Sequence, residues 1–438
     1  MSVNAVDIIC KKRDGKVLNR TEIETFIKGY SNGEIPDYQA AALLMAIYFS
    51  QMSEDETFDL TRAMRDSGDI VDLSDIAGTK VDKHSTGGVG DKVTLIVAPI
   101  AAACGVPIAK MSGRGLGFTG GTVDKLESIP GFRTSLEPEA FHKQVNEIGI
   151  AVIGQSGKIA PADKKLYALR DVTGTVENLS LIASSIMSKK LAAGSDAILL
   201  DVKCGKGAFM KSEADALKLA ELMCKIGISQ GKKMAAIISD MSCPLGEAVG
   251  NSLEVIEAIE VLKGNFSGDL LKLCLNIAAA MIVLGEKADC FDEAYEMASS
   301  AIASGSALKK LSDMIEYQGG DSSVIDDYSI FRTARLSRNL IAQSHGYIAA
   351  IDAEAIGLAS QYTGAGRTRK EDEIDYGAGI KILVKVGDKV KKGDIIAKLY
   401  SSEEEKIKIA MSEAARAFDI SDCKPEEITL IKNKIGIN

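Results

Sequence analysis

Two glycine-rich loops limit what this chain can fold into more than any other feature of its sequence. They span residues 85–91 (STGGVGD) and 112–122 (SGRGLGFTGGT), and each follows a short apolar segment and leads into a helix-like one. That order predicts a strand, a loop and a helix, twice over. Glycine allows the backbone to approach a ligand closely and to adopt positive φ angles. Such loops expose backbone N–H groups and hydroxyls at a helix start, so the pair predicts a site for one phosphate or other oxyanion.

Neither loop matches a common nucleotide motif. The sequence contains no GxxxxGK[ST] pattern, and residues 88–90 (GVG) lack the third glycine of GxGxxG. An alternative interpretation is that the glycines only form tight turns. Two loops close together in the sequence, both with hydroxyl and lysine side chains, favour anion binding instead. The cations and donors around the loops are Lys83, Ser85, Thr94, Lys110, Ser112 and Thr122.

Short apolar runs alternate with helix-like segments in the middle of the chain. The runs lie near residues 107–111, 148–154, 196–203 and 233–239, and residues 250–318 have helical spacing. This pattern predicts an α/β fold with a mainly parallel central sheet, in which ligands bind beyond the carboxyl ends of the strands. Both glycine-rich loops lie where that rule expects a ligand.

Residues 1–66 are predicted to form a helical lobe. Two segments, 21–24 (TEIE) and 53–56 (SEDE), match the capping-box pattern of helix starts. Residues 40–47 are apolar on all sides, so the helix that contains them is expected to be buried on several faces. That helix belongs either to the core of the lobe or to a subunit interface.

The character of the sequence changes towards the C-terminus. Residues 331–336, 347–351 and 380–384 are predicted strands separated by turn residues. The turn at 386–394 is similar to that of biotinyl and lipoyl carrier domains, but the modifiable lysine flanked by methionines is missing. We therefore expect residues 330–438 to form a small α+β domain of structural purpose rather than a carrier module.

Composition argues against several classes of function. The chain has 438 residues, of which 46% are hydrophobic and 26% charged, as in ordinary soluble globular proteins. Its formal net charge of -9 argues against a nucleic-acid or anionic-membrane partner. The eight cysteines show no CxxC pair and no zinc spacing, which indicates reduced thiols in the cytoplasm. No signal peptide is expected, and the longest apolar runs are too short to span a bilayer.

Two further groups of residues have chemistry that suits a catalytic site. His84 stands inside the first loop among the expected phosphate donors, where a side chain that titrates near neutrality could donate a proton. Arg170, Ser185 and Lys189 form the second group. On these residues alone, a charged surface helix with an Arg170–Asp171 pair is the preferred interpretation.

The loops also carry a resemblance to a known family. Residues 83–91 (KHSTGGVGD) and 112–127 (SGRGLGFTGGTVDKLE) are similar to the signature of the thymidine and pyrimidine-nucleoside phosphorylases, and the similarity extends over nearly the whole chain. The resemblance implies that inorganic phosphate attacks C1′ of uridine, thymidine or deoxyuridine and releases the base and ribose or deoxyribose 1-phosphate with inversion. It also implies a homodimer formed through the helical lobe, and no organic cofactor is expected.

The resemblance assigns roles to individual residues. It implies that His84 is catalytic and lies near O2 of the base, and that Arg170, Ser185 and Lys189 bind the base and stabilise it as it departs. The residues implied to bind phosphate are Lys83, His84, Ser85, Thr94, Lys110, Met111, Ser112 and Thr122. The family also binds a monovalent cation, usually potassium, and the matching ligands are Gly90 and Lys92 through their carbonyls, Leu245, Ala248 and Glu257.

Three positions bear on the subtype. Phe118 replaces a histidine common in the motif, so the contacts near the base are expected to differ. Thr94 stands where some relatives have serine and keeps the hydroxyl. Lys110 matches the broad pyrimidine enzymes and could bond to a 2′-hydroxyl, which favours acceptance of uridine over a thymidine-restricted phosphorylase. The other alternative is an anthranilate-type phosphoribosyltransferase, for which the sequence offers no convincing acidic cluster to hold magnesium.

The resemblance also completes the expected domain organisation. Residues 160–190 interrupt the α/β alternation and, by resemblance, return to the helical lobe of residues 1–66, which faces the α/β domain across the active-site cleft. The α/β phosphate-binding domain then comprises residues 67–159 and 191–329. The C-terminal α+β domain follows as residues 330–438.

Overall fold

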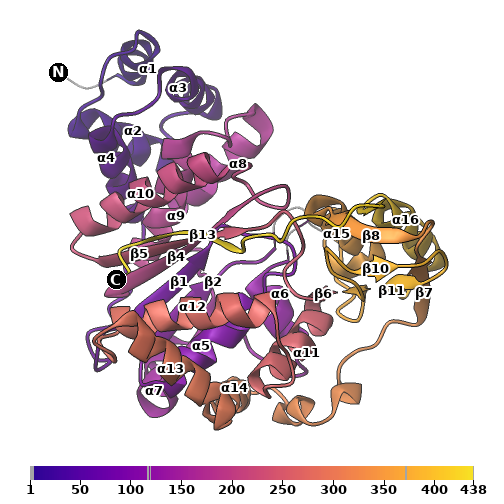
Figure 1. Ribbon diagram of the computed structural model, residues 1–438. Helices are drawn as coiled ribbons and strands as arrows, with labels where there is room; N and C mark the ends of the chain where they lie inside the picture. The colour runs from indigo at the N-terminus through magenta and orange to yellow at the C-terminus, as the bar shows by residue number, and fades with distance from the viewer. Residues whose placement is uncertain (1–3, 116–117, 119, 370–371, 438) are drawn as a thin grey trace. The chain divides into compact units, whose positions relative to one another are not determined.

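The computed structural model describes residues 4–437, apart from 116–117, 119 and 370–371 (Figure 1). The chain divides into two compact units, each built from separated stretches of sequence. The first unit comprises Met1–Asp75, Gln155–Ile198 and Lys218–Met234, and the second comprises Ile76–Gly154, Leu199–Leu217 and Ala235–Asn438.

The first unit is built of helices around one apolar core. Ala162 and Leu166 lie in the same core as Phe26, Leu44 and Leu60, so segments far apart in the sequence pack together. The helices are α1 (Ala5–Arg13), α2 (Arg20–Ser31), α3 (Asp37–Ser50), α4 (Glu54–Arg65), α8 (Pro161–Thr173), α9 (Leu179–Ala192) and the end of α10 (Glu213–Ser229).

The starts of two of these helices test the capping patterns. α4 begins after Ser53, which forms a capping box with Glu56, as predicted. The prediction for residues 21–24 is wrong, because the capping box lies two residues earlier, with Asn19 as N-cap and Glu22 completing the box. The side chain of Asn19 accepts the N–H of Glu22 at 3.0 Å. Asparagine is a strong N-cap, so the competing threonine falls inside the first turn.

The second unit has the α/β order that the apolar runs predict. Its central sheet has the strand order β1-β4-β5-β13, and β2 pairs with β3 in parallel. The N–H of Val81 donates to the carbonyl of Pro107 at 3.3 Å, which places β2 beside β1. The mainly parallel sheet is therefore confirmed (Figure 1). The strands are β1 (Val81–Ser85), β2 (Ile108–Ser112), β3 (Ile150–Gly154), β4 (Ala197–Cys204) and β5 (Lys233–Asp240).

Helices cover this sheet within the second unit. α5 (Val93–Ala103) is buried along almost its whole length, and α11, α12, α13 and α14 pack against it. Their apolar faces follow the helical spacing of residues 250–318. The helices of this group are α6 (Thr122–Glu127), α7 (Pro138–Ile148), α11 (Asn251–Leu262), α12 (Asp269–Leu284), α13 (Phe291–Ala303) and α14 (Ser306–Tyr317), and η1 (Ser322–Ile325) and η2 (Tyr328–Ile330) follow. In the part of the chain that the structure describes, no helix is both long and apolar enough to cross a membrane.

The C-terminal part of the second unit contains two small sheets, with strand orders β6-β9-β11-β7 and β10-β8-β12. The last strand, β13, leaves this region and pairs antiparallel with β5 at the edge of the central sheet (Figure 1). No sequence pattern predicts that pairing. The elements are β6 (Ala248–Val249), β7 (Leu336–Ile341), β8 (Gly346–Ile351), α15 (Ala353–Ser360), η3 (Gln361–Ala365), β9 (Gly379–Ile382), β10 (Lys389–Val390), β11 (Ile395–Ser401), α16 (Glu404–Ala415), β12 (Phe418–Ser421) and β13 (Ile431–Ile435).

The strand predicted over residues 331–336 is wrong. The structure has β7 starting at Leu336, where the predicted strand ends. The partner strand β11 ends at Ser401, which pairs with Leu336, so the preceding residues have no strand beside them. Backbone pairing in the tertiary structure, rather than local propensity, decides where this strand begins.

A buried ion pair in the first unit gives a stability prediction. The ammonium of Lys12 lies 2.8 Å from Glu56, and both side chains are almost fully buried. The same carboxylate accepts the N–H groups of Leu18 and Ser53, each at 2.8 Å. Because Glu56→Ala leaves a buried ammonium without its counter-charge, we expect a loss of about 3–5 kcal/mol in the free energy of unfolding, measured by urea denaturation. The control Glu24→Ala removes an exposed partner of Arg20 and should change stability little; equal effects of the two variants would contradict the argument.

Candidate active site

The first glycine-rich loop connects β1 to α5 and is held by its own side chains. The hydroxyl of Ser85 donates to the carboxylate of Asp91, and the N–H of Gly87 donates to Ser85 Oγ at 3.2 Å. Oδ1 of Asp91 in turn accepts the N–H of Val93 at the start of α5, at 3.3 Å. Gly87 and Gly90 have φ angles of 95° and 72°, which favour glycine over other residues. The loop is therefore a fixed turn at the carboxyl end of a strand.

Asp91 of this loop belongs to a network of four charged side chains with Lys83, Asp201 and Lys203, and the last three are fully buried. Lys83, in the middle of β1, lies 2.9 Å from Asp201 and 4.0 Å from Asp91. Lys203 lies 2.8 Å from the same Asp201, and the hydroxyl of Ser239 on β5 donates to that carboxylate at 2.9 Å. The set contains two ammonium groups and two carboxylates, so its charges compensate one another away from water.

The pKa values of this network follow from the pairing. Burial on its own disfavours the ammonium of Lys83, but the carboxylates of Asp201 and Asp91 outweigh burial and raise its pKa above the ordinary value. Burial likewise disfavours the carboxylate of Asp91, and the ammonium groups of Lys83, Lys203 and Lys125 outweigh it and hold its pKa well below the usual range. Lys83 and Asp91 therefore both remain charged at neutral pH.

Sequence reasoning missed Asp201 and Lys203. Both lie on β4, two residues apart, so their side chains point to the same face of the strand. The signal was present, because a strand of apolar residues that carries an acid and a lysine two positions apart must compensate those charges when it is buried. Lys83 shares Asp201 with Lys203, but it lies more than a hundred residues before both of them in the sequence.

The second loop begins at the end of β2, beside the first. Lys110 Nζ lies 3.0 Å from Asp82 Oδ1 and also donates to the carbonyl of Lys83. These contacts bring the carboxyl ends of β1 and β2 together. Further along, the N–H of Gly115 donates to Asp124 at 2.8 Å, and Arg114 pairs with Glu127 at 2.6 Å. Residues 116–117 and 119 of the signature motif lie outside the described residues.

The residues predicted to bind phosphate all lie on the two loops or on the elements that flank them. Lys83, Thr94, Lys110 and Ser112 are buried. His84, Ser85, Met111 and Thr122 are partly buried. The two lysines among them pair with carboxylates of the chain itself: Lys83 pairs with Asp201, and Lys110 pairs with Asp82. These ion pairs fix the positions of both ammonium groups.

The C-terminal part of the second unit reaches the same loops. Val89 of the first loop belongs to the apolar core of that region, and Phe118 packs against this core. A Cβ on Gly357 of α15 would lie 2.8 Å from both Val89 and the ring of Phe118. The phenylalanine that replaces the motif histidine thus serves apolar packing.

The residues predicted to hold potassium surround a lysine side chain. Lys92 Nζ donates to the carbonyls of Leu245 and Ala248, both at 2.9 Å, and to Glu257 Oε2 at 2.5 Å. The carbonyls of Gly90 and Lys92, the other two expected ligands, accept the N–H groups of Lys92 and Leu95, each at 2.9 Å. These oxygens therefore do not fit a separate ion in addition to the ammonium of Lys92.

The cluster expected to bind the base lies in the first unit. The guanidinium of Arg170 is buried and donates to the carbonyls of Thr175 at 3.1 Å, Leu181 at 3.0 Å and Val176 at 2.6 Å. Burial lowers the pKa of Arg170 from its ordinary value. The alternative of a surface Arg170–Asp171 pair is wrong, because the side chain turns inwards to backbone oxygens.

Lys189 and Ser185 lie one turn apart on α9. Lys189 Nζ pairs with Asp163 of α8 and donates to Ser185 Oγ at 3.0 Å. Asp163 and Arg170 both lie on α8, and Arg170 donates to the carbonyl of Leu181 on α9, so these two neighbouring helices carry all three predicted base-binding residues. The assignment of Arg170, Ser185 and Lys189 to the base stays a prediction.

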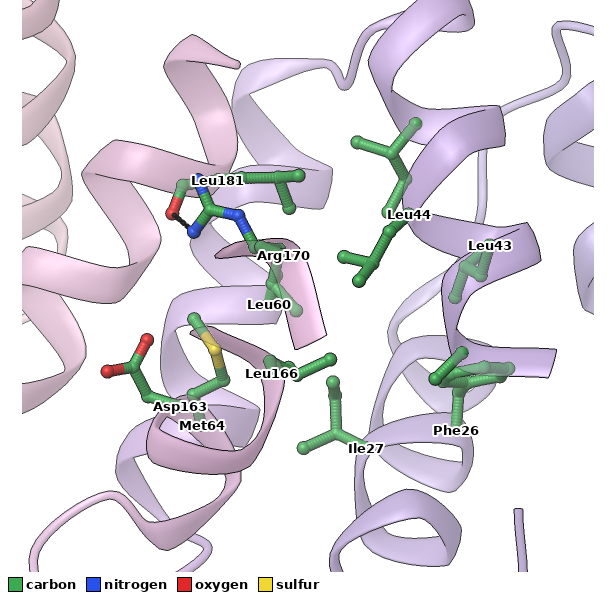
Figure 2. A pocket seen from close by; sticks show the side chains of 12 residues that line it. Phe26, Ile27, Leu43, Leu44, Leu60, Met64, Asp163, Leu166, Arg170 and Leu181 are labelled. Carbon is green, nitrogen blue, oxygen red and sulfur yellow. Dashed lines mark hydrogen bonds between the residues drawn. The ribbon is translucent and has the colours of Figure 1, made fainter. Parts of the chain in front are cut away.

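A small cavity also lies in the first unit (Figure 2). It is lined mainly by apolar side chains such as Phe26, Leu44 and Leu166, while the guanidinium of Arg170 turns to the backbone of Leu181. Its volume is about 30 Å³, which is close to the space of one water molecule. This cavity is a packing gap in the helical core and is too small for a nucleoside.

Two models of one glycosyltransferase family match large parts of this chain. Residues 77–308 match the model described as "Glycosyl transferase family, a/b domain", and residues 6–68 match its helical bundle domain. The fold is like that of anthranilate phosphoribosyltransferase from Thermus thermophilus, with a TM-score of 0.57 and 21% identity over 71% of this chain and 99% of that one. The chain thus has the fold of this glycosyltransferase class.

The C-terminal region and the curated relatives specify the family. Residues 347–421 match the model "Pyrimidine nucleoside phosphorylase C-terminal domain". The chain is 57% identical to the pyrimidine-nucleoside phosphorylase of Staphylococcus haemolyticus over 91% of its length and 92% of the relative's. It is 53% identical to that of Geobacillus stearothermophilus over 98% of its length and 99% of the relative's. The chain therefore belongs to the pyrimidine-nucleoside phosphorylase family.

The buried network at β1 and β4 gives a second stability prediction. Asp201→Asn keeps the shape of the side chain but leaves Lys83 and Lys203 with only Asp91 as counter-charge, so we expect the free energy of unfolding to fall by about 3–5 kcal/mol. The matched control is Asp419→Asn at an exposed position of β12, which should stay within about 0.5 kcal/mol of the unmodified protein. Chemical denaturation monitored by circular dichroism measures both, and an Asp201→Asn variant as stable as the control would contradict the network.

Proposed function

We propose that this protein catalyses the phosphorolysis of pyrimidine nucleosides to free base and ribose or deoxyribose 1-phosphate. The observation that carries the proposal is its family membership, since relatives named pyrimidine-nucleoside phosphorylases match it over more than nine-tenths of its length. Two glycine-rich loops at the adjacent ends of β1 and β2 support it, because such loops suit a phosphate ligand.

Phosphate is the nucleophile of the proposed reaction. One of its oxygens forms a bond to C1′ while the bond from C1′ to N1 of the base breaks, and the electron pair of that bond leaves with the base. Catalysis then consists mainly of holding one anion in line and stabilising another as it forms. The proposed phosphate ligands are Lys83, His84, Ser85, Thr94, Lys110, Met111, Ser112 and Thr122.

The departing base is an anion whose charge spreads over its carbonyl oxygens and N3, and Arg170, Ser185 and Lys189 are its proposed partners. Of the five N–H groups of a guanidinium, those of Arg170 donate three hydrogen bonds to carbonyls of the described chain, which leaves two for the base. Lys189 is held by Asp163 and Ser185 in the same way. Donors fixed before the reaction stabilise a developing charge without reorganisation. His84 is proposed to act at O2 of the base, as acid or as electrostatic partner.

A homodimer is part of this proposal. α3 buries Leu43, Leu44 and Ile47 within the first unit, yet it exposes 75% of Tyr38 and 77% of Phe49. Large exposed apolar side chains on a helix that is apolar on all sides favour a partner surface. Light scattering in solution measures the mass of the particle and tests this part of the proposal.

A direct assay tests the proposed reaction. The protein should release uracil from uridine only when phosphate is present, whereas a phosphoribosyltransferase would leave uridine intact, because its reaction requires a 5′-phosphorylated ribose and pyrophosphate. Lys83→Ala should raise KM for phosphate by about 10- to 100-fold, the equivalent of one lost hydrogen bond to a charged group, and change KM for uridine much less. Lys309→Ala on the exposed face of α14 is the control. Uracil release without phosphate, or an unchanged phosphate dependence in Lys83→Ala, would contradict the assignment.

Lys110 tests the breadth of the substrate range. Uridine and deoxyuridine differ only in the 2′-hydroxyl, so the ratio of their kcat/KM values reports contacts to that group. If Lys110 bonds to the 2′-hydroxyl, Lys110→Met should lower the uridine to deoxyuridine ratio by about tenfold. Because both substrates are measured on the same variant, any general damage from unpairing Asp82 cancels. An unchanged ratio would assign Lys110 to another task.

A further inference from the structure

The side chain of Lys92 ends among oxygen atoms that otherwise suit a bound cation. Its ammonium has three N–H groups, and the structure gives it three acceptors, the carbonyls of Leu245 and Ala248 and the carboxylate of Glu257. The side chain is fully buried. All of its hydrogen-bonding capacity is used in this one place.

The carboxylate of Glu257 is itself fixed towards the ammonium. Oε1 accepts the N–H of Glu247 at 2.7 Å and Oε2 accepts the N–H of Ala248 at 2.8 Å. One negative and one positive charge therefore meet in a water-excluded place, and they balance. A second positive charge would lie there without a counter-charge in this set of residues, at a large cost in desolvation.

The backbone closes tightly around this pair. Gly246 has a φ of 75°, and a Cβ at that position would lie 2.9 Å from Lys92 Nζ and 2.4 Å from Glu257 Oε1. A Cβ on Gly90 would lie 2.5 Å from the carbonyl oxygen of Leu245. The two glycines allow the chain to wrap the ammonium closely, as it would wrap an ion.

We propose that the ammonium of Lys92 takes the place of a monovalent cation in this protein, so that the protein folds and works without bound potassium. An ammonium group and a potassium ion carry the same charge and are similar in size, and both prefer several oxygen partners. Because this ammonium is covalently part of the chain at the start of α5, the site among these oxygens is filled whatever salt is in solution. This inference goes beyond the proposed function, because it concerns what stabilises the loop rather than what the loop binds.

Lys92 acts as a positioning residue for the first glycine-rich loop. It directly follows the loop and is the N-cap of α5, and its side chain reaches the segment of residues 245–257. The N–H of Leu245 also donates to the carbonyl of Val89 at 3.0 Å. The loop is thus tied to that segment at two points, one through the backbone and one through the ammonium.

The first experiment uses the unmodified full-length protein. It is dialysed into a buffer in which tetramethylammonium is the only added cation, and its melting temperature and phosphorolysis rate are compared with those in potassium chloride at the same ionic strength. We expect the same melting temperature and a change in kcat/KM of less than about twofold, since a ligand that does not bind cannot stabilise the folded state. A clear rise of either quantity with potassium overturns the proposal.

The second experiment uses two variants of Lys92. Lys92→Ala opens a space beside Glu257, which added potassium can fill, whereas Lys92→Met fills the same space with an uncharged chain. Without potassium we expect both to melt at lower temperature and to lose about 10- to 100-fold in kcat/KM, as when a catalytic loop shifts by about 1 Å. Potassium should restore Lys92→Ala with saturation and leave Lys92→Met unchanged. Lys309→Ala should behave as the unmodified protein in every buffer.

The outcomes separate this inference from the proposed function. The melting temperatures require no assay of activity, so they decide the role of Lys92 even if uridine is not the substrate. If Lys92→Ala folds and potassium raises neither its melting temperature nor its rate, the oxygens around Lys92 are not a cation site and the proposal fails. If neither variant folds, the response of the unmodified protein to potassium still decides it.

Discussion

The compensation of buried charge around the first glycine-rich loop is the constraint on which the rest of the second unit depends. Lys83 and Lys203 share Asp201, Lys92 pairs with Glu257, and Lys125 pairs with Glu254 at 2.9 Å while it donates to the carbonyl of Asp91 at 2.8 Å. An unpaired ammonium in such surroundings would cost several kcal/mol. Each pair therefore fixes the position of its two segments, and together they define the shape of the loop before any ligand arrives.

The predicted base-binding residues in the first unit follow the same principle with different partners. Arg170 is held mainly by backbone carbonyls, and Lys189 by Asp163 and Ser185. Both side chains have lost their rotamer freedom when the chain folds, so that freedom is not lost again on binding. Donors held in this way suit the stabilisation of a negative charge that exists only during the reaction.

Sequence patterns predict those elements whose bounds depend on interactions between residues close together in the chain. Local patterns located β2 to β5, α11 to α14 and the cap of α4, because periodicity and capping act over a few residues. They failed at residues 331–336 and at Asn19, where a strand partner and a stronger cap decided the outcome. Among the candidate site residues, the glycine-rich loops gave a chemical signal, whereas the cluster of Arg170, Ser185 and Lys189 rested on the resemblance alone.

The sequence by itself determined the α/β class, the two loops and the kind of ligand they suit, because glycine spacing and apolar alternation express backbone geometry directly. Only the tertiary structure decided which charges meet. Lys83 and Asp201, and Lys92 and Glu257, are separated by more than a hundred residues, and no local pattern records such a pairing. A buried charge must find its partner wherever the fold brings one within reach, so that choice belongs to the packing of the whole unit.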